Sequence, residues 1–299
     1  MKKGICLVLT TAIISGFSVF INKFAVMNFN AQVFTTLKNA IVGLYFIALL
    51  IALKDFQLIK KIKGREWLKL MLIGLIGGSL PFLLFFQGLS QTTAAKGGFI
   101  HKTMFVYVAI FSLLLLKEKF NKQLFIGLIS LITANILFLK IKPQPLQVGD
   151  LLILLATFLW ALEIILSKKM LKDLPGRIVA AARMCFGAIF MFGYLAFSHQ
   201  LSFTIASGNQ WFWLIATSTI LFAYNFTFYA GLKHISATVA ASILALGAPI
   251  TLILNIIFLG QGFSQKEIIG FVLIVISLLM ISQLNLKKYK KLNITNARS

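Results

Sequence analysis

The sequence predicts an all-α integral membrane protein with ten transmembrane helices, built as two inverted five-helix repeats around a central cavity. Three observations lead to this prediction. The composition is too apolar for a soluble globule, long apolar segments follow one another along the chain, and the two halves of the chain match in register.

The composition excludes both a soluble and a disordered chain. Of the 299 residues, 59% are hydrophobic and only 12% are charged, whereas soluble domains carry roughly 25% charged residues. Disorder is excluded because 13% of the residues are aromatic. A spanning helix needs about 20 apolar residues, so ten helices use roughly 200 residues and leave roughly 100 for short connections. No room remains for a separate soluble domain.

Ten apolar segments, each bounded by charges, proline or polar clusters, supply these helices. In chain order they span 4–26, 30–53, 67–88, 92–116, 122–141, 150–166, 175–197, 211–230, 235–260 and 268–286. Each is close to the length that a membrane-spanning helix requires. We expect helices because the strands of a membrane barrel would alternate apolar and polar residues, whereas these segments are apolar throughout. The first segment lacks a small-residue cleavage site, so we expect a retained anchor and not a signal peptide.

The distribution of basic residues predicts the orientation. The formal net charge is +22, from 29 lysines and arginines against seven acids. With a cytoplasmic N-terminus, 21 of the basic residues fall in inside segments, three fall outside and five lie within spans. This bias predicts a multi-pass protein of the inner or plasma membrane with both termini in the cytoplasm. Because the charge is spread over every cytoplasmic loop, it favours anionic lipid headgroups as partners and argues against nucleic acid.

The second half of the chain repeats the first half in the opposite orientation. At an offset of 145 residues Lys38 aligns with Arg183, and after a shift of two residues in a loop Gly88 aligns with Gly231. Because five is an odd number of helices, the second half enters the membrane from the other face. We therefore expect repeats at 1–146 and 147–299, the second ending in a short basic cytoplasmic tail. Such repeats form a site at their interface that can face either side of the membrane.

Four stretches resemble a known family. They are 15–23 (SGFSVFINK), 116–119 (LKEK), the Gly-Asp-Leu, Trp-Ala and Ser-Lys-Lys groups within 149–169, and the Ala-Pro pair at 248–249. In this order they resemble the EamA-type ten-helix exporters of the drug/metabolite transporter superfamily. The tryptophan of the family's first helix is missing here, 260–262 lacks the acid of 116–119, and Val106 stands where the second repeat has Pro249. The resemblance implies a bundle with a central cavity that moves a small metabolite by alternating access.

Six ionisable residues within the predicted spans stand out and need a partner or a wet cavity, because a charge at the bilayer centre costs at least roughly 2.5–3.5 kcal/mol. They are Lys38, Lys96, His101, Lys102, Glu163 and Arg183. Glu163 lies roughly 20 Å from the outer edge and Arg183 roughly 12 Å from the inner edge, so we expect the two to meet. The pair either holds two helices together or opens so that Arg183 can bind a substrate carboxylate.

Besides Arg183, the basic candidates are one residue of the second segment and three residues of the fourth. Lys38 is the repeat mate of Arg183, which suggests a role in the fold, with snorkelling to the interface as the alternative. Lys96 lies near the outer end of the fourth segment and can also snorkel. His101 and Lys102 are adjacent and deeper, so we expect a positive local field that favours an anionic or carboxylate-bearing solute. The other explanation is that backbone carbonyls of broken helices accept the hydrogen bonds of these two side chains.

Aromatic and amide side chains are further candidates for the wall of the cavity. Trp160, Tyr224, Asn225 and Tyr229 fit a small organic solute, although ordinary helix packing explains them equally well. Pro81, three residues after a Gly-x-x-x-Gly pattern, predicts close packing or a bend in the third segment.

These features favour a secondary-active transporter, an exporter of a small metabolite such as an amino acid or another carboxylate-bearing solute. The alternative is an exchanger of phosphorylated or other anionic metabolites. Efflux of cationic drugs is less favoured because the buried cations outnumber the single buried acid, Glu163. Proton coupling through His101, Lys102 or Glu163 and assembly as a homodimer stay open.

Other classes of function lack their motifs in this sequence. No Walker A pattern is present, so ATP is not expected to drive transport. Neither HExxH nor GxSxG occurs, and Cys6 and Cys185 show no metal-ligand spacing. We therefore expect no enzyme, no catalytic or metal-binding residues and no cofactor. A structural or receptor protein would need longer loops than this chain has.

Overall fold

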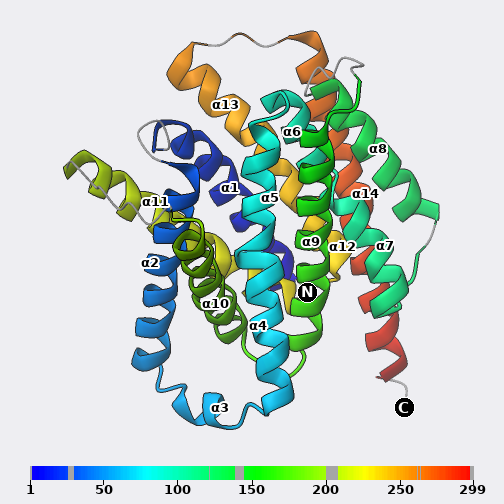
Figure 1. Cartoon of the computed structure of the whole chain (residues 1–299). Helices are drawn as coiled ribbons and strands as arrows, with labels where there is room; N and C mark the ends of the chain where they lie inside the picture. The colour runs from blue at the N-terminus through cyan, green and yellow to red at the C-terminus, as the bar shows by residue number, and fades with distance from the viewer. Residues whose placement is uncertain are drawn as a thin grey trace.

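The computed structural model is helical throughout, within the part of the chain that it describes, residues 2–25, 30–120, 122–138, 145–199, 208–260, 262 and 264–296 (Figure 1). The first half contains α1 (Lys2–Ala25), α2 (Ala31–Ala52), α3 (Phe56–Lys60), α4 (Gly64–Gly78), α5 (Leu80–Leu89), α6 (Ala94–Lys102), α7 (Met104–Leu116) and α8 (Lys122–Phe138). The second half contains α9 (Val148–Met170), α10 (Gly176–Phe197), α11 (Gly208–Leu232), α12 (Ala237–Ile243), the 3₁₀ turn η2 (Leu244–Leu246), α13 (Gly247–Leu259) and α14 (Gln265–Asn296).

Each of the ten predicted segments corresponds to one helix or to helices in line, and the chain is an all-α membrane protein. Within the described residues, eight of the segments are long and apolar enough to cross a membrane. The fifth segment, α8, has 17 residues in the described range. Two of the predicted segments end too early, because α9 continues to Met170 and α14 to Asn296. In both places lysines continue the helix, which their high helix propensity permits.

Three segments are broken within their length. Between α4 and α5, Ser79 leaves the helical region (φ −137°, ψ −75°) and Pro81 follows, so the predicted bend is confirmed. Between α6 and α7 the break lies at Thr103. In the ninth segment it lies at η2, and Leu246 aligns with Thr103 at the repeat offset of 143 residues. The fourth and ninth segments are therefore interrupted at matching positions.

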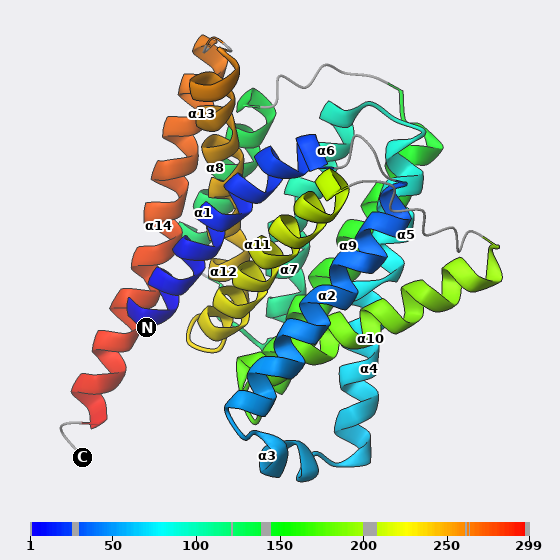
Figure 2. The same ribbon diagram turned by 90° about the vertical axis from the view of Figure 1, so that its left-hand side faces the viewer.

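The helices of the two halves pack in pairs that map onto each other when the halves are exchanged. The helix α1 lies against α11 and α13, and its counterpart α9 lies against α4, α5, α6 and α7. The pairs α2 with α10 and α8 with α14 join counterparts directly, as Figures 1 and 2 show. This arrangement is what a two-fold relation between inverted repeats produces. The exact division between residues 146 and 147 stays a prediction.

Small residues let the helices approach at the centre, while large apolar residues cover the outside. A Cβ atom placed on Gly187 of α10 would lie 2.7 Å from the Gly78 Cα atom of α4, so the two backbones touch at this crossing. Leu44, Leu114 and Ile257 are 63%, 65% and 68% exposed. In a bilayer these side chains contact lipid, which is as apolar as they are.

Polar contacts tie the helices together at the end of the bundle where α7 ends and α12 begins. Glu118 accepts hydrogen bonds from the first backbone N–H of α12 (3.0 Å) and from the Thr238 hydroxyl (3.1 Å). Lys168, near the end of α9, donates to the carbonyls of Leu232 (2.6 Å) and Ile235 (2.7 Å). The connection between α11 and α12 is therefore held on both sides.

Candidate functional site

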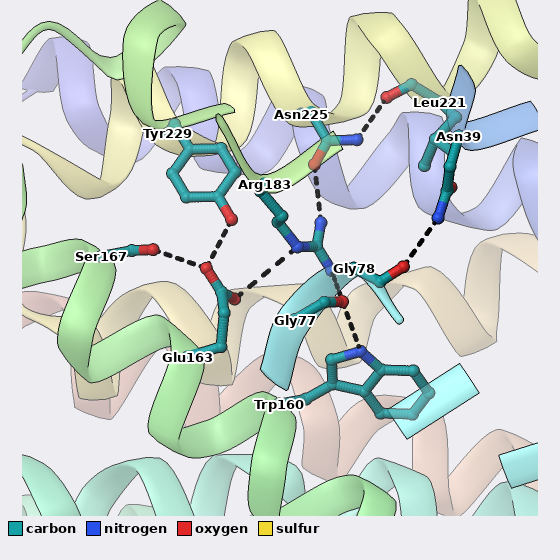
Figure 3. A network of polar contacts seen from close by, with 10 residues as sticks. All are labelled: Asn39, Gly77, Gly78, Trp160, Glu163, Ser167, Arg183, Leu221, Asn225 and Tyr229. Carbon is teal, nitrogen blue, oxygen red and sulfur yellow. Dashed lines mark hydrogen bonds and ion pairs between the residues drawn. The ribbon is translucent and has the colours of Figure 1, made fainter. Parts of the chain in front are cut away.

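An acid and a base from neighbouring helices meet in the middle of the bundle. Arg183 Nε of α10 lies 4.0 Å from Glu163 Oε2 of α9, and the two side chains are only 12% and 3% exposed (Figure 3). The prediction that these residues meet is thus confirmed. Helical rise fixes their depths, and α10 follows α9 after a short turn, so the two depths coincide.

Two hydroxyl groups hold the Glu163 carboxylate. Ser167, one turn further along α9, donates to Glu163 Oε1 at 2.5 Å, and the Tyr229 hydroxyl of α11 donates to the same oxygen at 2.6 Å. Tyr229 is completely buried. A buried carboxylate is costly unless it is paired and hydrogen-bonded, and here it has both an ionic neighbour and two donors.

Neutral oxygens hold the Arg183 guanidinium. Its Nη1 donates to Asn225 Oδ1 at 2.7 Å and its Nη2 donates to the Gly77 carbonyl at 3.0 Å, as Figure 3 shows. Its Nε is buried and has no hydrogen-bond partner among the described residues. Trp160 donates from its indole N–H to the same Gly77 carbonyl at 3.1 Å. The guanidinium is therefore fixed in place while part of its donor capacity stays unused.

The break in the third segment supplies the carbonyls of this site. Asn39 Nδ2 of α2 donates to the Gly78 carbonyl at 2.9 Å, next to the Gly77 carbonyl that binds Arg183. Gly77 also provides space, since a Cβ atom there would overlap the Glu163 side chain and lie 3.0 Å from Arg183 Nε. Side chains of three helices, α2, α9 and α10, thus converge on one short stretch of open backbone in α4.

His101 and Lys102 lie where α6 ends at the break in the fourth segment. The His101 ring packs against Trp160 (centroids 4.9 Å apart) and Phe85 (5.4 Å), and its Nδ1 has no partner in the described part of the chain. Because Trp160 bonds to the same Gly77 carbonyl as Arg183, the structure places His101 beside the Arg183 site. Lys102 is half-buried.

The two other cations have partners outside the central network. Lys38 lies over the Phe34 ring at 5.1 Å and donates weakly to Asn22 Oδ1 at 3.4 Å. Lys96 forms an ion pair with Asp150 of α9 and donates to the Pro145 carbonyl at 2.6 Å. The structure does not bring Lys96 into the central site; it joins the starts of α6 and α9.

Tyr224 is half-buried and stacks on Phe228, with ring centroids 5.9 Å apart. Its neighbour Asn225 is the residue of this pair that reaches Arg183. A small apolar cavity lies between α8, α13 and α14. It is lined by Phe138, Pro249, Leu252, Ile253 and Phe271. None of the predicted site residues lines it.

Sequence reasoning missed three members of the site: Asn39, Ser167 and the backbone of Gly77. The sequence contains a signal for two of them, Ser167 and Gly77. Ser167 lies four residues after Glu163 on a helix, where side chains meet. Pro81 lies four residues after Gly77, so the Gly77 carbonyl loses its helical partner.

The charges and donors of this arrangement can bind a solute reversibly. In the described residues no group of three His, Cys, Asp or Glu side chains could hold a metal ion. A fixed guanidinium with an unused N–H, beside an acid and an aromatic cluster, can bind and release a carboxylate without forming a covalent bond.

Comparisons with known proteins cover nearly the whole chain. Residues 2–140 and 147–283 each match the model of the EamA-like transporter family. An uncharacterized transporter of Clostridium kluyveri is 27% identical over 98% of this chain and 96% of its own length. The riboflavin transporter ImpX of Fusobacterium nucleatum is 26% identical over 81% of this chain and 85% of its own. A crystal structure with 18% identity superimposes with a TM-score of 0.78, over 94% of this chain and 97% of that one.

Proposed function

The chain belongs to the EamA-like transporter family, and from that membership we propose that this membrane transporter is a secondary-active exporter of a small carboxylate-bearing metabolite, such as an amino acid. The solute binds at Arg183, near the middle of the bundle, and the two halves rock around it to expose the site to either side. Both termini lie on the cytoplasmic side of the cell membrane, as the basic loops indicate.

The observation that carries this proposal is the state of Arg183. Its hydrogen bonds go to Asn225 and to the Gly77 carbonyl, both neutral, and the nearest carboxylate oxygen is 4.0 Å from its Nε. A contact at that distance is weaker than the close bidentate pair that arginine forms with a carboxylate. A solute carboxylate can therefore gain a stronger contact than the one it displaces.

The broken helices support a rocking mechanism. Transporters with inverted repeats commonly place their sites at discontinuous helices near the midplane, and here a carbonyl at the break in the third segment holds Arg183. Glu163, Trp160 and Asn225 are buried in this conformation, so access to Arg183 requires the helices to part. The ties at Glu118 on one end and at Lys96 on the other join the two halves, so such a motion must break them.

Exchange of phosphorylated or other anionic metabolites is the second candidate. It is favoured by the surplus of cations in the spans, where Lys38, Lys102 and Arg183 outnumber Glu163, the acid of the central network. The name of the Fusobacterium relative adds riboflavin as a neutral aromatic solute to test. Under either candidate, Glu163 is the group that we expect to carry a coupling proton, because it is the acid nearest to the bound anion.

A binding screen on the protein in nanodiscs tests the proposal. Metabolites grouped by charge, with riboflavin included, are added and the unfolding temperature is measured for wild type, Arg183→Ala and Arg65→Ala. Arg65 is an exposed arginine outside the spans and serves as the matched control. A ligand at 100 times its Kd adds about 2.7 kcal/mol to the stability of the folded state.

We expect carboxylates to raise the unfolding temperature of wild type and of Arg65→Ala by several degrees and to leave Arg183→Ala unchanged. A larger response to phosphorylated solutes would favour the exchanger. Stabilisation by carboxylates that persists in Arg183→Ala would contradict the proposal.

A further inference from the structure

Pro81, just after the helix break at Ser79, removes the helical donor of one carbonyl, that of Gly77. In an α-helix the carbonyl of residue i accepts the N–H of residue i+4, and for Gly77 that residue is Pro81, which has no N–H. The next donor, the N–H of Phe82, bonds to the Ser79 carbonyl at 2.9 Å. The Gly77 carbonyl therefore faces the bundle unused by its own helix.

Two side chains from other helices take up this carbonyl. Arg183 Nη2 donates to it at 3.0 Å and Trp160 Nε1 donates to it at 3.1 Å. A carbonyl oxygen has two lone pairs, so both are already in use. A third donor arriving from the helix itself would have to displace the arginine or the indole.

We propose that Pro81 is a positioning residue for Arg183: by withholding one backbone N–H, it leaves the Gly77 carbonyl to hold the guanidinium and the Trp160 indole together. The proline acts through that missing donor, and its effect as a bend in the helix is secondary. The solute-binding role of Arg183 rests on the proposed function above, but the positioning itself does not depend on it.

A substitution that restores the N–H at position 81 distinguishes the proposed positioning role of Pro81 from a purely structural role of its ring. Pro81→Ala supplies a helical donor to the Gly77 carbonyl. Replacing Pro81 by lactic acid, which puts an ester oxygen in place of the nitrogen, removes the ring but still supplies no donor. Should the ester protein not fold, pipecolic acid, a six-membered imino acid without an N–H, takes its place. The unfolding temperature in nanodiscs checks that each protein is folded.

The readout is the side-chain NMR spectrum of protein labelled with ¹⁵N-arginine. The chain has four arginines, and Arg183 is assigned by the signal that Arg183→Lys removes. Arg177, which bonds to Asp55 and not to the break, is the internal control. A second readout is the emission of Trp160 in a background with Trp67, Trp211 and Trp213 changed to phenylalanine.

We expect Pro81→Ala to shift the Nε signal of Arg183 or the emission maximum of Trp160, while the proteins without a donor at position 81 keep the wild-type spectra and Arg177 stays unmoved in all of them. Wild-type spectra in Pro81→Ala would overturn the proposal, and so would equal shifts with and without the donor. If the spectra behave as expected but Arg183→Ala still binds carboxylates, the positioning stands and the proposed function fails.

Discussion

At the scale of single residues, the partners of Arg183 explain how a cation can persist in the bilayer and still be available to a solute. Burying an isolated charge is costly, and the Asn225 and Gly77 oxygens offset that cost with two hydrogen bonds. Glu163 is occupied by Tyr229 and Ser167 instead of by a close contact with the guanidinium. The charges of Glu163 and Arg183 thus compensate each other, while the Nε of Arg183 is left able to donate to a solute.

Lys96 and Lys102 lie six residues apart on the same helix and should differ in function. Lys96 is paired with Asp150, which is 1% exposed, so Lys96→Ala leaves a buried acid without its cation and should lower stability by about 1–3 kcal/mol. Lys102 adjoins the break, so we expect Lys102→Ala to lower solute counterflow at least tenfold per folded protein. Counterflow in sealed vesicles and unfolding temperature, measured on both variants, check this.

The reverse pattern would count against the assignment. If Lys102→Ala and Lys96→Ala show equal and mild losses of counterflow when both are normalised to folded protein, Lys102 has no part in the solute pathway. A fully stable Lys96→Ala would show that the ion pair with Asp150 contributes little.

At the scale of elements, α3 joins α2 to α4, and an ion pair fixes its start. Asp55, which precedes α3, accepts hydrogen bonds from Arg177 Nε and from Arg177 Nη2 (2.7 Å), the arginine lying in the first turn of α10. Asp55 is 5% exposed and Arg177 30%. The hydrogen bonds from Arg177 lower the pKa of the Asp55 carboxyl below its ordinary value of 3.8.

The lowered pKa of Asp55 predicts a pH dependence of stability. A carboxyl whose pKa is lower in the folded state contributes stability that is complete above its unfolded pKa, about 4, and is lost as the pH falls through the folded pKa. We expect Asp55→Asn to be less stable than wild type by about 1 kcal/mol at pH 6–7, the low end for a charged hydrogen bond because Arg177 is partly exposed.

Unfolding temperatures of wild type and Asp55→Asn between pH 7 and pH 3 measure this contribution. The difference between the two proteins should stay constant down to about pH 4 and shrink below it. A difference that grows as the pH falls would mean that the sign of the pKa shift is wrong.

At the scale of the whole molecule, the sequence was sufficient for features that depend on helix geometry and composition. Ten apolar segments, the bend at Pro81 and the meeting of Glu163 with Arg183 follow from segment length and from a rise of about 1.5 Å per residue. The family model matching once in each half agrees with the internal repeat seen at Lys38 and Arg183.

The features that were missed depend on which backbone and side-chain atoms face each other across helices. Lys96 finds its acid on α9, and a search along its own helix could not reveal that partner. The Gly77 carbonyl is open because Pro81, four residues later, has no N–H, and its use by Arg183 and Trp160 depends on the packing of α4 against α9 and α10. Periodicity alone carries no information about such contacts.

The proposed transport requires a polar centre that opens alternately to the two sides of the membrane, and cysteine accessibility tests this requirement most directly. In a background with Cys6 and Cys185 replaced, Lys102→Cys and Thr103→Cys are exposed in oriented vesicles to an impermeant maleimide, added outside or inside. Ile153→Cys, at a fully buried packing position, is the control. We predict labelling of positions 102 and 103 from each side and none at 153. Protection of both positions from both sides, or labelling from one side only, would contradict the account.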